Sequence, residues 1–315
     1  MGAPNDSVVV TMWSHVVRLG PTRYLVGPVN VAGRLAIYRS DGTLDRVIRL
    51  KPAFFPDGTP WESPHQVGPM FESASGAAVV LDMGNGRLML VDTVGGLRTY
   101  ASLRGSVFGG LSLPDGRMVI NAQYPPGESL GRPLHIIDNK RIVRSIGPAA
   151  GRLGPLSTSD FRVLASARGG NFWTSPHDRY ELSLMDSLGR VATTLTRPFA
   201  SAAPGPGGTM AFGVASIRED ADGYLWVVSL RREGVSDVKA DERITPATIR
   251  GLAAGLTSTV DIIDPRRGEV IYSQSFAGPA TPFIADGLVY RHRDDASGTH
   301  RIEVVSMRLT RPNAR

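Results

Sequence analysis

Apolar and polar residues recur along the chain in one short pattern. A variable residue is followed by an apolar one, another variable one and two apolar ones, and the run usually ends in Asp. The copies are RLMLVD, PLHIID, ELSLMD and TVDIID, ending at Asp92, Asp138, Asp186 and Asp264, with looser copies RLAIYR and RIEVVS ending at Arg39 and Ser306. Such alternation is typical of a half-buried strand. The Asp is expected to begin a turn, because its side chain can accept hydrogen bonds from nearby backbone amides.

Each copy has further strand signals around it. Five of the six copies are followed by a second β-rich run: TLDRVIRL, GLRTYASL, KRIVRSIG, GRVATTLT and GEVIYSQSF. Upstream of each copy is a hairpin signal, two alternating runs joined by a turn that contains glycine, as in SLPDGRMVINA around Gly116 and SIREDADGYLWVVSL around Gly223. Each period therefore holds about four strands in up-and-down order. Six such periods predict an all-β protein, a six-bladed β-propeller.

The two ends of the chain bear on how the last blade closes. The sixth period ends in RIEVVSMRLTRPNAR without a convincing fourth strand, while the N-terminal run DSVVVTM belongs to no blade. We expect Val8–Met12 to complete the last blade as its outer strand; the alternative is a frayed terminal arm. Residues 1–315 are predicted to form one domain with an insertion at about 231–257 in the fifth blade. Thr245 and Pro246 predict one short helix in that insertion.

Two stretches, SIREDADGYLWVVSL and GRLAIYRSDGTLDRVI, resemble the NHL/TolB-like repeats of six-bladed propellers. The C-terminal stretch resembles the end of bacterial proteins described only as six-bladed β-propellers, and this resemblance implies an exported protein. Related calcium-dependent lactonase propellers carry an Asn-Gly ahead of a Pro-Asp-Gly hairpin. Here Pro114–Gly116 matches the hairpin, but Gly109 and Gly110 stand in the place of the Asn-Gly. One expected calcium ligand is therefore missing, and we predict no metal site and no cofactor.

Composition excludes some chemistries. The 315 residues contain no cysteine, which rules out a disulfide framework, a thiolate metal site and a cysteine nucleophile. No apolar run is long enough to predict a transmembrane helix. The chain has 35 Lys+Arg against 29 Asp+Glu, and only Lys51, Lys140 and Lys239 are lysines. An arginine-rich composition alone could produce this balance, so the position of the arginines in the fold matters more than their number.

The predicted propeller separates charge between its two faces. The loops between second and third strands are predicted to carry arginines, among them Arg132, Arg179, Arg231, Arg232, Arg291 and Arg293, whereas the turns on the opposite face carry aspartates. This predicts a basic face that attracts anionic partners, since the Arg guanidinium fits carboxylates and phosphates. The alternative is that turns favour Asp and an arginine-rich chain places Arg on any loop. Nucleic-acid binding is not favoured, because Tyr124, Tyr180 and Trp61 do not alternate regularly with basic residues.

Few residues suggest catalysis. The His177-Asp178-Arg179 run is predicted on a loop between second and third strands, where a solvated role is the simpler interpretation. His65 lies near Glu62 and Glu72 in the sequence without a second histidine at ligand spacing, which favours a structural role. We assign no catalytic residue.

The sequence favours a non-enzymatic protein-interaction module, an extrinsic scaffold subunit of a membrane-associated complex outside the cytoplasm, periplasmic or secreted. The partner is expected to be an anionic protein or membrane-protein complex. The aromatic residues of the loop over 51–70 would either anchor this partner or cap the first two blades. The alternative is a hydrolase or lyase working in a central cavity, lactonase-like and Ca²⁺-dependent; a small-ligand sensor is a third interpretation. The predicted partner-binding residues are Arg132, Arg179, Arg231, Arg232, Arg291, Arg293, Phe54, Phe55 and Trp61.

Overall fold

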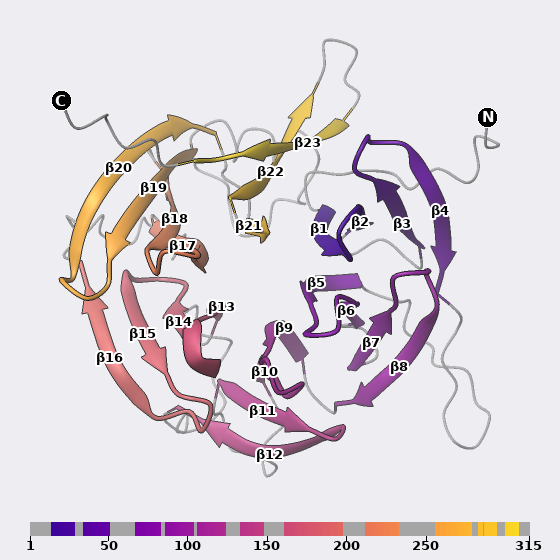
Figure 1. The fold of residues 1–315 in the computed structure, drawn as a ribbon, viewed down its shortest axis with the longest axis horizontal. Helices are drawn as coiled ribbons and strands as arrows, with labels where there is room; N and C mark the ends of the chain where they lie inside the picture. Colours follow the sequence, from indigo (N-terminus) through magenta and orange to yellow (C-terminus); the bar gives the residue numbers. More distant parts are fainter. Residues whose placement is uncertain are drawn as a thin grey trace, which may run out of the picture. The chain divides into compact units, whose positions relative to one another are not determined.

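The six sequence repeats fold into six antiparallel sheets in the computed structural model of the chain (Figure 1). In each sheet the strands follow one another in sequence order and pair with their chain neighbours. The structure describes residues 14–28, 34–50, 67–82, 86–103, 106–123, 133–147, 161–197, 212–232, 256–278, 283–285, 287–294 and 300–308.

The first three sheets have four strands each. The first sheet contains β1 (Ser14–Leu19), β2 (Arg23–Pro28), β3 (Arg34–Arg39) and β4 (Leu44–Arg49). The second contains β5 (Val67–Glu72), β6 (Ala78–Asp82), β7 (Arg87–Val91) and β8 (Leu97–Ser102). The third contains β9 (Ser106–Ser112), β10 (Met118–Gln123), β11 (Leu134–Asp138) and β12 (Arg141–Ile146).

The remaining sheets follow the same plan. The fourth contains β13 (Arg162–Ser166), β14 (Phe172–Pro176), β15 (Glu181–Met185) and β16 (Val191–Thr196). The fifth has longer strands: β17 (Phe212–Glu219), β18 (Leu225–Arg232), β19 (Leu256–Asp264) and β20 (Glu269–Ala277). The sixth has three described strands, β21 (Phe283–Ala285), β22 (Leu288–Asp294) and β23 (His300–Ser306).

The fold class is all-β, a six-bladed β-propeller, as the repeats predict. All six copies of the apolar pattern form the third strand of a sheet, and the five β-rich runs that follow copies form the fourth strands of the first five sheets. The predicted outer strand Val8–Met12 and the helix predicted near Thr245 lie outside the described residues.

The turns between strands depend on glycine and aspartate. Gly116 and Gly223 have φ of 88° and 87°, a left-handed conformation that side chains with a Cβ rarely adopt. Asp186 directly follows the third strand of its repeat, and its Oδ1 accepts hydrogen bonds from the backbone N–H groups of Leu188 and Arg190, both at 2.9 Å. Asp92 and Asp220 accept two backbone N–H groups in the same way. The pattern aspartates Asp92 and Asp186 therefore fix their turns, as the sequence predicts.

These turn contacts predict a specific acid sensitivity. The backbone hydrogen bond from Arg190, with the neighbouring contacts, holds the pKa of Asp186 below its ordinary value. The ionised carboxylate therefore favours the folded state, and its contribution is complete above the unfolded pKa of about 3.9. It is lost as pH falls through the lower folded pKa. We expect Asp186→Asn to lose less stability than the wild type between about pH 5 and pH 2, measured by urea unfolding. An identical acid response in both proteins would contradict this.

Contacts divide the chain into two compact units. Unit 1 comprises Met1–His177 and Leu182–Thr194, and unit 2 comprises Asp178–Glu181 and Leu195–Arg315. One domain over residues 1–315 therefore stays a prediction.

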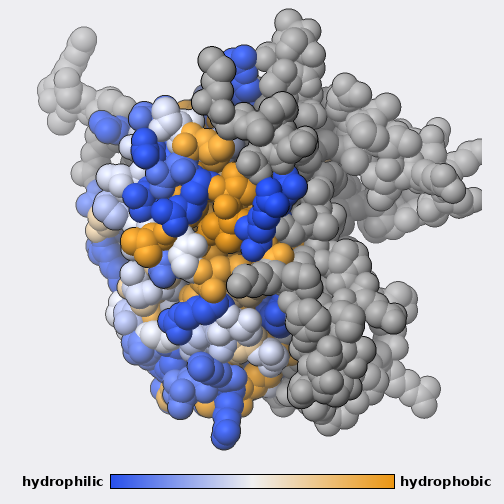
Figure 2. Space-filling view, turned by 90° about the vertical axis from the view of Figure 1, so that its right-hand side faces the viewer, coloured by the Kyte–Doolittle hydropathy of each residue, from blue (hydrophilic) through white to orange (hydrophobic). Residues whose placement is uncertain are grey.

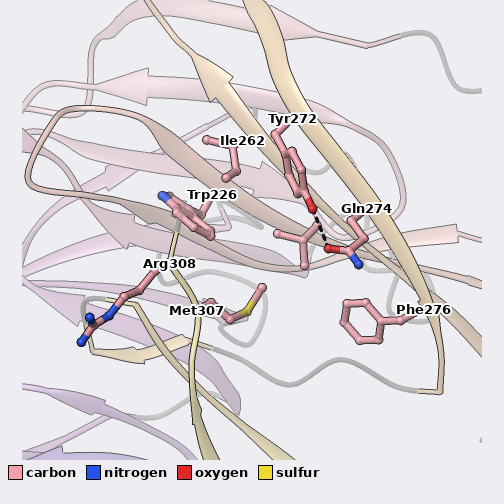
Figure 3. Close-up of a pocket in the computed structure, with 8 residues that line it drawn as sticks. Trp226, Ile262, Tyr272, Gln274, Phe276, Met307 and Arg308 are labelled. Carbon is pink, nitrogen blue, oxygen red and sulfur yellow. Dashed lines mark hydrogen bonds between the residues drawn. The ribbon is translucent and has the colours of Figure 1, made fainter. Parts of the chain in front are cut away.

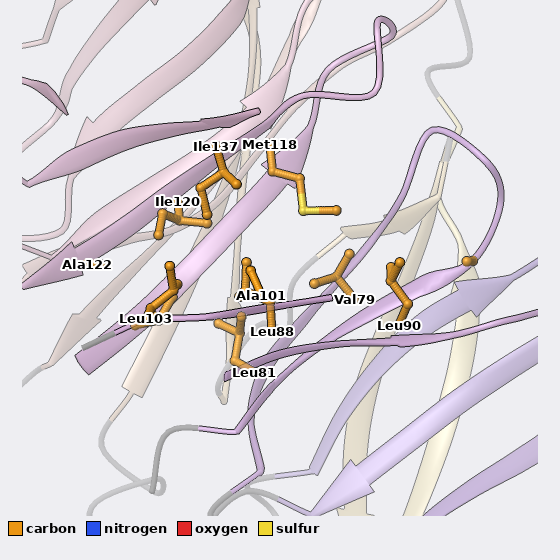
Figure 4. Close-up of a cluster of buried hydrophobic side chains, with 12 residues drawn as sticks. Val79, Leu81, Leu88, Leu90, Ala101, Leu103, Met118, Ile120, Ala122 and Ile137 are labelled. Carbon is orange, nitrogen blue, oxygen red and sulfur yellow. The ribbon is translucent and has the colours of Figure 1, made fainter. Parts of the chain in front are cut away.

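Unit 1 has its core between the faces of successive sheets. Figure 4 shows one such cluster, in which β6, β7 and β8 of the second sheet meet β10 and β11 of the third. Leu81, Leu88 and Ile120 at its centre have no exposed surface. Each strand contributes alternate side chains to this cluster, which is why the sequence alternates.

The outer strands of unit 1 carry charge. Figure 2 views the molecule from the side where β4 and β8 lie in Figure 1, and hydrophilic side chains surround a hydrophobic band there. Arg46 and Arg49 on β4 and Arg98 on β8 are exposed. Charged side chains on an outermost strand discourage pairing with another chain.

Four predicted loop arginines lie in strands. The ladder of β18 and β19 continues through Arg231 and Arg232, which pair with Thr257 and Leu256. Likewise, β22 continues to Asp294, so Arg291 and Arg293 pair with residues of β23. The prediction that these arginines lie in loops is wrong, because backbone pairing extends these two hairpins beyond the apolar run. The segment between β18 and β19 is correspondingly shorter than predicted, residues 233–255.

Candidate functional site

One face of the fifth sheet in unit 2 gathers apolar side chains. Trp226 on β18 pairs with Ile262 on β19, which pairs with Tyr272 on β20. Because side chains alternate along a strand, Gln274 and Phe276 of β20 project to the same face as Tyr272.

These side chains line an open groove (Figure 3) with a volume of about 320 Å³. We call it the β20 groove, and its lining residues are Trp226, Val260, Ile262, Tyr272, Gln274, Phe276, Met307 and Arg308. Met307 and Arg308 follow β23 directly, so the chain after the sixth sheet forms one wall.

The groove joins a buried floor to an exposed rim. Val260 and Ile262 are 2% and 1% exposed, whereas Tyr272 and Phe276 are 43% and 41% exposed. The Tyr272 hydroxyl donates a 2.7 Å hydrogen bond to Oε1 of Gln274, drawn in Figure 3, which aligns two rim side chains. Two exposed aromatic rings over an apolar floor therefore remain available for contact.

A second hollow of about 370 Å³ shares Trp226, Met307 and Arg308 with the β20 groove. Its other lining residues are more polar: Arg218, Asp220, Ala221, Asp222, Tyr224, Phe283 and Gly287. The Trp226 indole N–H donates a 2.8 Å hydrogen bond to Oδ2 of Asp220. The hydrogen bond to Asp220 therefore holds the Trp226 ring in place where the two hollows meet. Arg308 also lines both hollows.

The opposite face of the fifth sheet contains a buried polar cluster. Asp261 on β19 has no exposed surface, and its Oδ2 accepts hydrogen bonds from the Tyr180 hydroxyl at 3.0 Å and from Arg197 Nη1 at 2.6 Å. The Arg197 side chain is 38% exposed. The other carboxylate oxygen, Oδ1, is buried and accepts no hydrogen bond from the described residues.

Tyr180 is a hydrogen-bond donor in this cluster. Burial of the side chain, and then the adjacent Asp261 carboxylate, raise the pKa of the Tyr180 hydroxyl far above its ordinary value. The hydroxyl therefore stays protonated and donates to Asp261. This geometry ties the loop before β15 to the fifth sheet, which is a structural role.

Three predicted partner-binding arginines have described side chains, all in unit 2. Arg179 Nε donates to Glu181 at 3.1 Å, and Arg291 Nε donates to Glu303 at 2.7 Å. Arg231 is exposed at the end of β18 and has no acidic partner within the described part of the chain. Arg231 therefore remains the best-placed member of the predicted basic set.

The other predicted contact residues lie outside the structural description, in whole or by their side chains. For Arg132, Phe54, Phe55 and Trp61 neither backbone nor side chain is described, and for Arg232 and Arg293 only the backbone is.

The aspartate-bearing turns are not purely acidic. Arg117 Nη2 lies 2.6 Å from Asp115 and Arg190 Nε lies 2.6 Å from Asp186, each pair within one turn. The predicted separation of charge is therefore weaker at these turns than the positions of the aspartates suggest.

The positions considered for catalysis or metal binding have contacts that support the fold. His177 lies between β14 and β15 as predicted, and its backbone N–H donates to the Phe161 carbonyl at 2.8 Å. Gly110, in the position compared with the lactonase ligands, faces Phe71: a Cβ there would lie 2.5 Å from the ring. Within the described ranges, no three His, Asp or Glu side chains are grouped so that they could hold a metal ion.

No known family model matches the chain, and no curated protein matches it in sequence. Solved structures resemble it in fold. A protein from Bacteroides fragilis whose name assigns it as exported has a TM-score of 0.58 at 11% identity, covering 92% of this chain and 81% of its own. A streptogramin B lyase has a TM-score of 0.55 at 11% identity, covering 97% and 86%. The calcium-binding protein regucalcin from Agrobacterium tumefaciens has a TM-score of 0.51 at 14% identity, covering 95% and 94%. At these identities the likeness establishes the fold alone.

The β20 groove is absent from the sequence predictions. Its residues come from three strands and the segment after β23, and no sequence spacing brings them together. One signal was present: Tyr272, Gln274 and Phe276 alternate along a strand without a charge. In an outer strand, such a run indicates a surface that packs against something.

Proposed function

We propose that this protein is a non-enzymatic protein-interaction module and that the β20 groove in unit 2 is its main contact surface. The observation that carries this proposal is the composition of the groove. Trp226, Tyr272, Phe276, Met307 and Arg308 are of the residue types enriched in protein interfaces.

The groove favours a partner with both apolar and acidic side chains. An apolar side chain would bury the exposed faces of Tyr272 and Phe276 against the floor of Val260 and Ile262. A carboxylate would pair with Arg308, which is exposed at the rim. The net charge of +6 would speed the approach of such a partner.

The cellular setting belongs to the same proposal. The module would act outside the cytoplasm as an extrinsic subunit of a membrane-associated complex. Support comes from the fold shared with the Bacteroides fragilis protein whose name assigns it as exported. No helix among the described residues is long and apolar enough to cross a membrane.

Charge reversal at Arg308, on the groove rim, tests this function. We expect Arg308→Glu to weaken partner binding about tenfold and to reduce its dependence on salt, because it replaces attraction with repulsion. The measurement is the affinity for the purified partner at about 50 and 300 mM salt. Arg98→Glu, an exposed arginine on β8 of unit 1, is the matched control. Equal affinities in the wild type, Arg308→Glu and Arg98→Glu would refute the contact surface.

A further inference from the structure

Strand β20 is longer than the other described outer strands. It has nine residues, all of them exposed, and β19 is its only neighbour among the described strands (Figure 1). Outer strands β4, β8 and β12 each carry arginine, whereas β20 carries no charge after Glu269 at its first position. Outer strand β16 is also uncharged, but it has only six residues, three of them threonine. An outermost strand presents unpaired backbone N–H and C=O groups, and charge normally keeps other chains away from them. Strand β20 lacks that protection.

The side chains of β20 are also strongly strand-forming. Val270, Ile271, Tyr272 and Phe276 are 39%, 45%, 43% and 41% exposed, an unusual apolar surface for one strand. The run contains no proline and no glycine. These properties favour the addition of another strand at this position.

We propose that β20 pairs with β20 of a second copy of this chain, antiparallel and related by two-fold symmetry. This goes beyond the proposed partner function, because it needs no other protein. A two-fold interface requires a surface that is complementary to itself, and β20 meets this condition. Because Val270–Ala277 holds no charge, no like charges meet when the strand faces its own copy.

The register of the pair follows from the regular part of the strand. Ile271 is skipped in the pairing with β19, since Ile262 pairs with Tyr272 and Ile263 with Val270. The regular run therefore starts at Tyr272. Centring the two-fold axis on Gln274 places Tyr272 opposite Phe276 of the second copy.

This register gives favourable pairs on both faces. The two Tyr272–Phe276 pairs are aromatic pairs across strands, among the more stabilising cross-strand combinations. The two Gln274 side chains meet at the axis, where their amides can hydrogen-bond. On the other face, Ser273 lies opposite Ser275 of the second copy. The two grooves then lie on the same face of one continuous sheet.

Analytical ultracentrifugation of the purified chain tests the pair without any added partner. We expect the wild type to shift from monomer to dimer as its concentration rises from about 1 to 100 µM. Gln274→Lys should raise the dimer dissociation constant at least about tenfold, because two lysines then meet at the axis. Gln274 is exposed, so this variant should fold. Thr99→Lys, at an exposed position of β8, is the matched control and should dimerise as the wild type does.

Cross-linking tests the register. The natural chain has no cysteine, so a single substitution gives one reactive thiol. Gln274→Cys should form a covalent dimer on mild oxidation, and Thr99→Cys should not. A monomer at every concentration, open-ended aggregates, or a dimer that Gln274→Lys leaves unchanged would each overturn the proposal.

Discussion

Replacing Arg197 with Met is expected to lower the free energy of unfolding by about 2–4 kcal/mol at pH 7. Arg197 supplies the only cation hydrogen-bonded to Asp261 among the described residues, at 2.6 Å. Without it, a carboxylate with no exposed surface keeps the Tyr180 hydroxyl as its one hydrogen-bond partner in the described part of the chain. Removing one member of a buried ion pair typically costs about 3–5 kcal/mol. We expect a smaller loss than this for Arg197→Met because the Arg197 side chain is 38% exposed, so water can enter the vacated space and solvate Asp261.

A double variant separates this charge effect from lost packing. Asp261→Asn combined with Arg197→Met removes the buried charge along with its partner, and should recover at least about 1 kcal/mol relative to Arg197→Met alone. Urea unfolding at pH 7 measures all three proteins. If the double variant is no more stable than the single one, the buried carboxylate is not the cause of the loss.

Replacing Phe172 with Ala is expected to destabilise unit 1 by about 3–5 kcal/mol. Phe172 on β14 has no exposed surface and belongs to a cluster that joins the third and fourth sheets. Its neighbours in that cluster include Leu111, Ile136 and Met185. These residues come from different strands and cannot all close over the empty volume. The cavity therefore adds to the lost transfer free energy.

Thermal and urea unfolding of Phe172→Ala check this value. Phe172→Leu should cost clearly less, because it keeps most of the buried volume. Val143→Ala on β12, whose side chain is 57% exposed, should change stability by less than about 0.5 kcal/mol. Equal losses in Phe172→Ala and Val143→Ala would show that this core does not hold the sheets together.

The sequence was sufficient for the fold because its signals are local. The apolar pattern ending at Asp92 or Asp186 coincides with one strand, and the turn after it is fixed by hydrogen bonds from residues two to four positions away. Strand ends were less predictable. At Arg231 and Arg291 the backbone ladder continues past the apolar run, and polar side chains give no signal for where pairing stops.

The candidate sites depend on residues that are far apart in the chain. Tyr180 and Asp261 are 81 positions apart and meet only because the loop before β15 packs on the fifth sheet. Met307 and Trp226 meet because the two residues after β23 lie against one face of that sheet. Neither relation follows from a spacing or a motif. The sequence predicted the strands that carry these side chains, but not which faces would meet.

Capture of the tagged protein from membrane and soluble fractions of its native host, with mass spectrometry, tests the central claim most directly. Wild type, Arg308→Glu and Arg98→Glu are compared at low salt and again at about 300 mM salt. The proposed function predicts one stoichiometric partner that is bound by wild type and Arg98→Glu, depleted in Arg308→Glu and released by salt. Recovery of the protein alone from both fractions, or equal recovery of a partner by all three proteins, would contradict it.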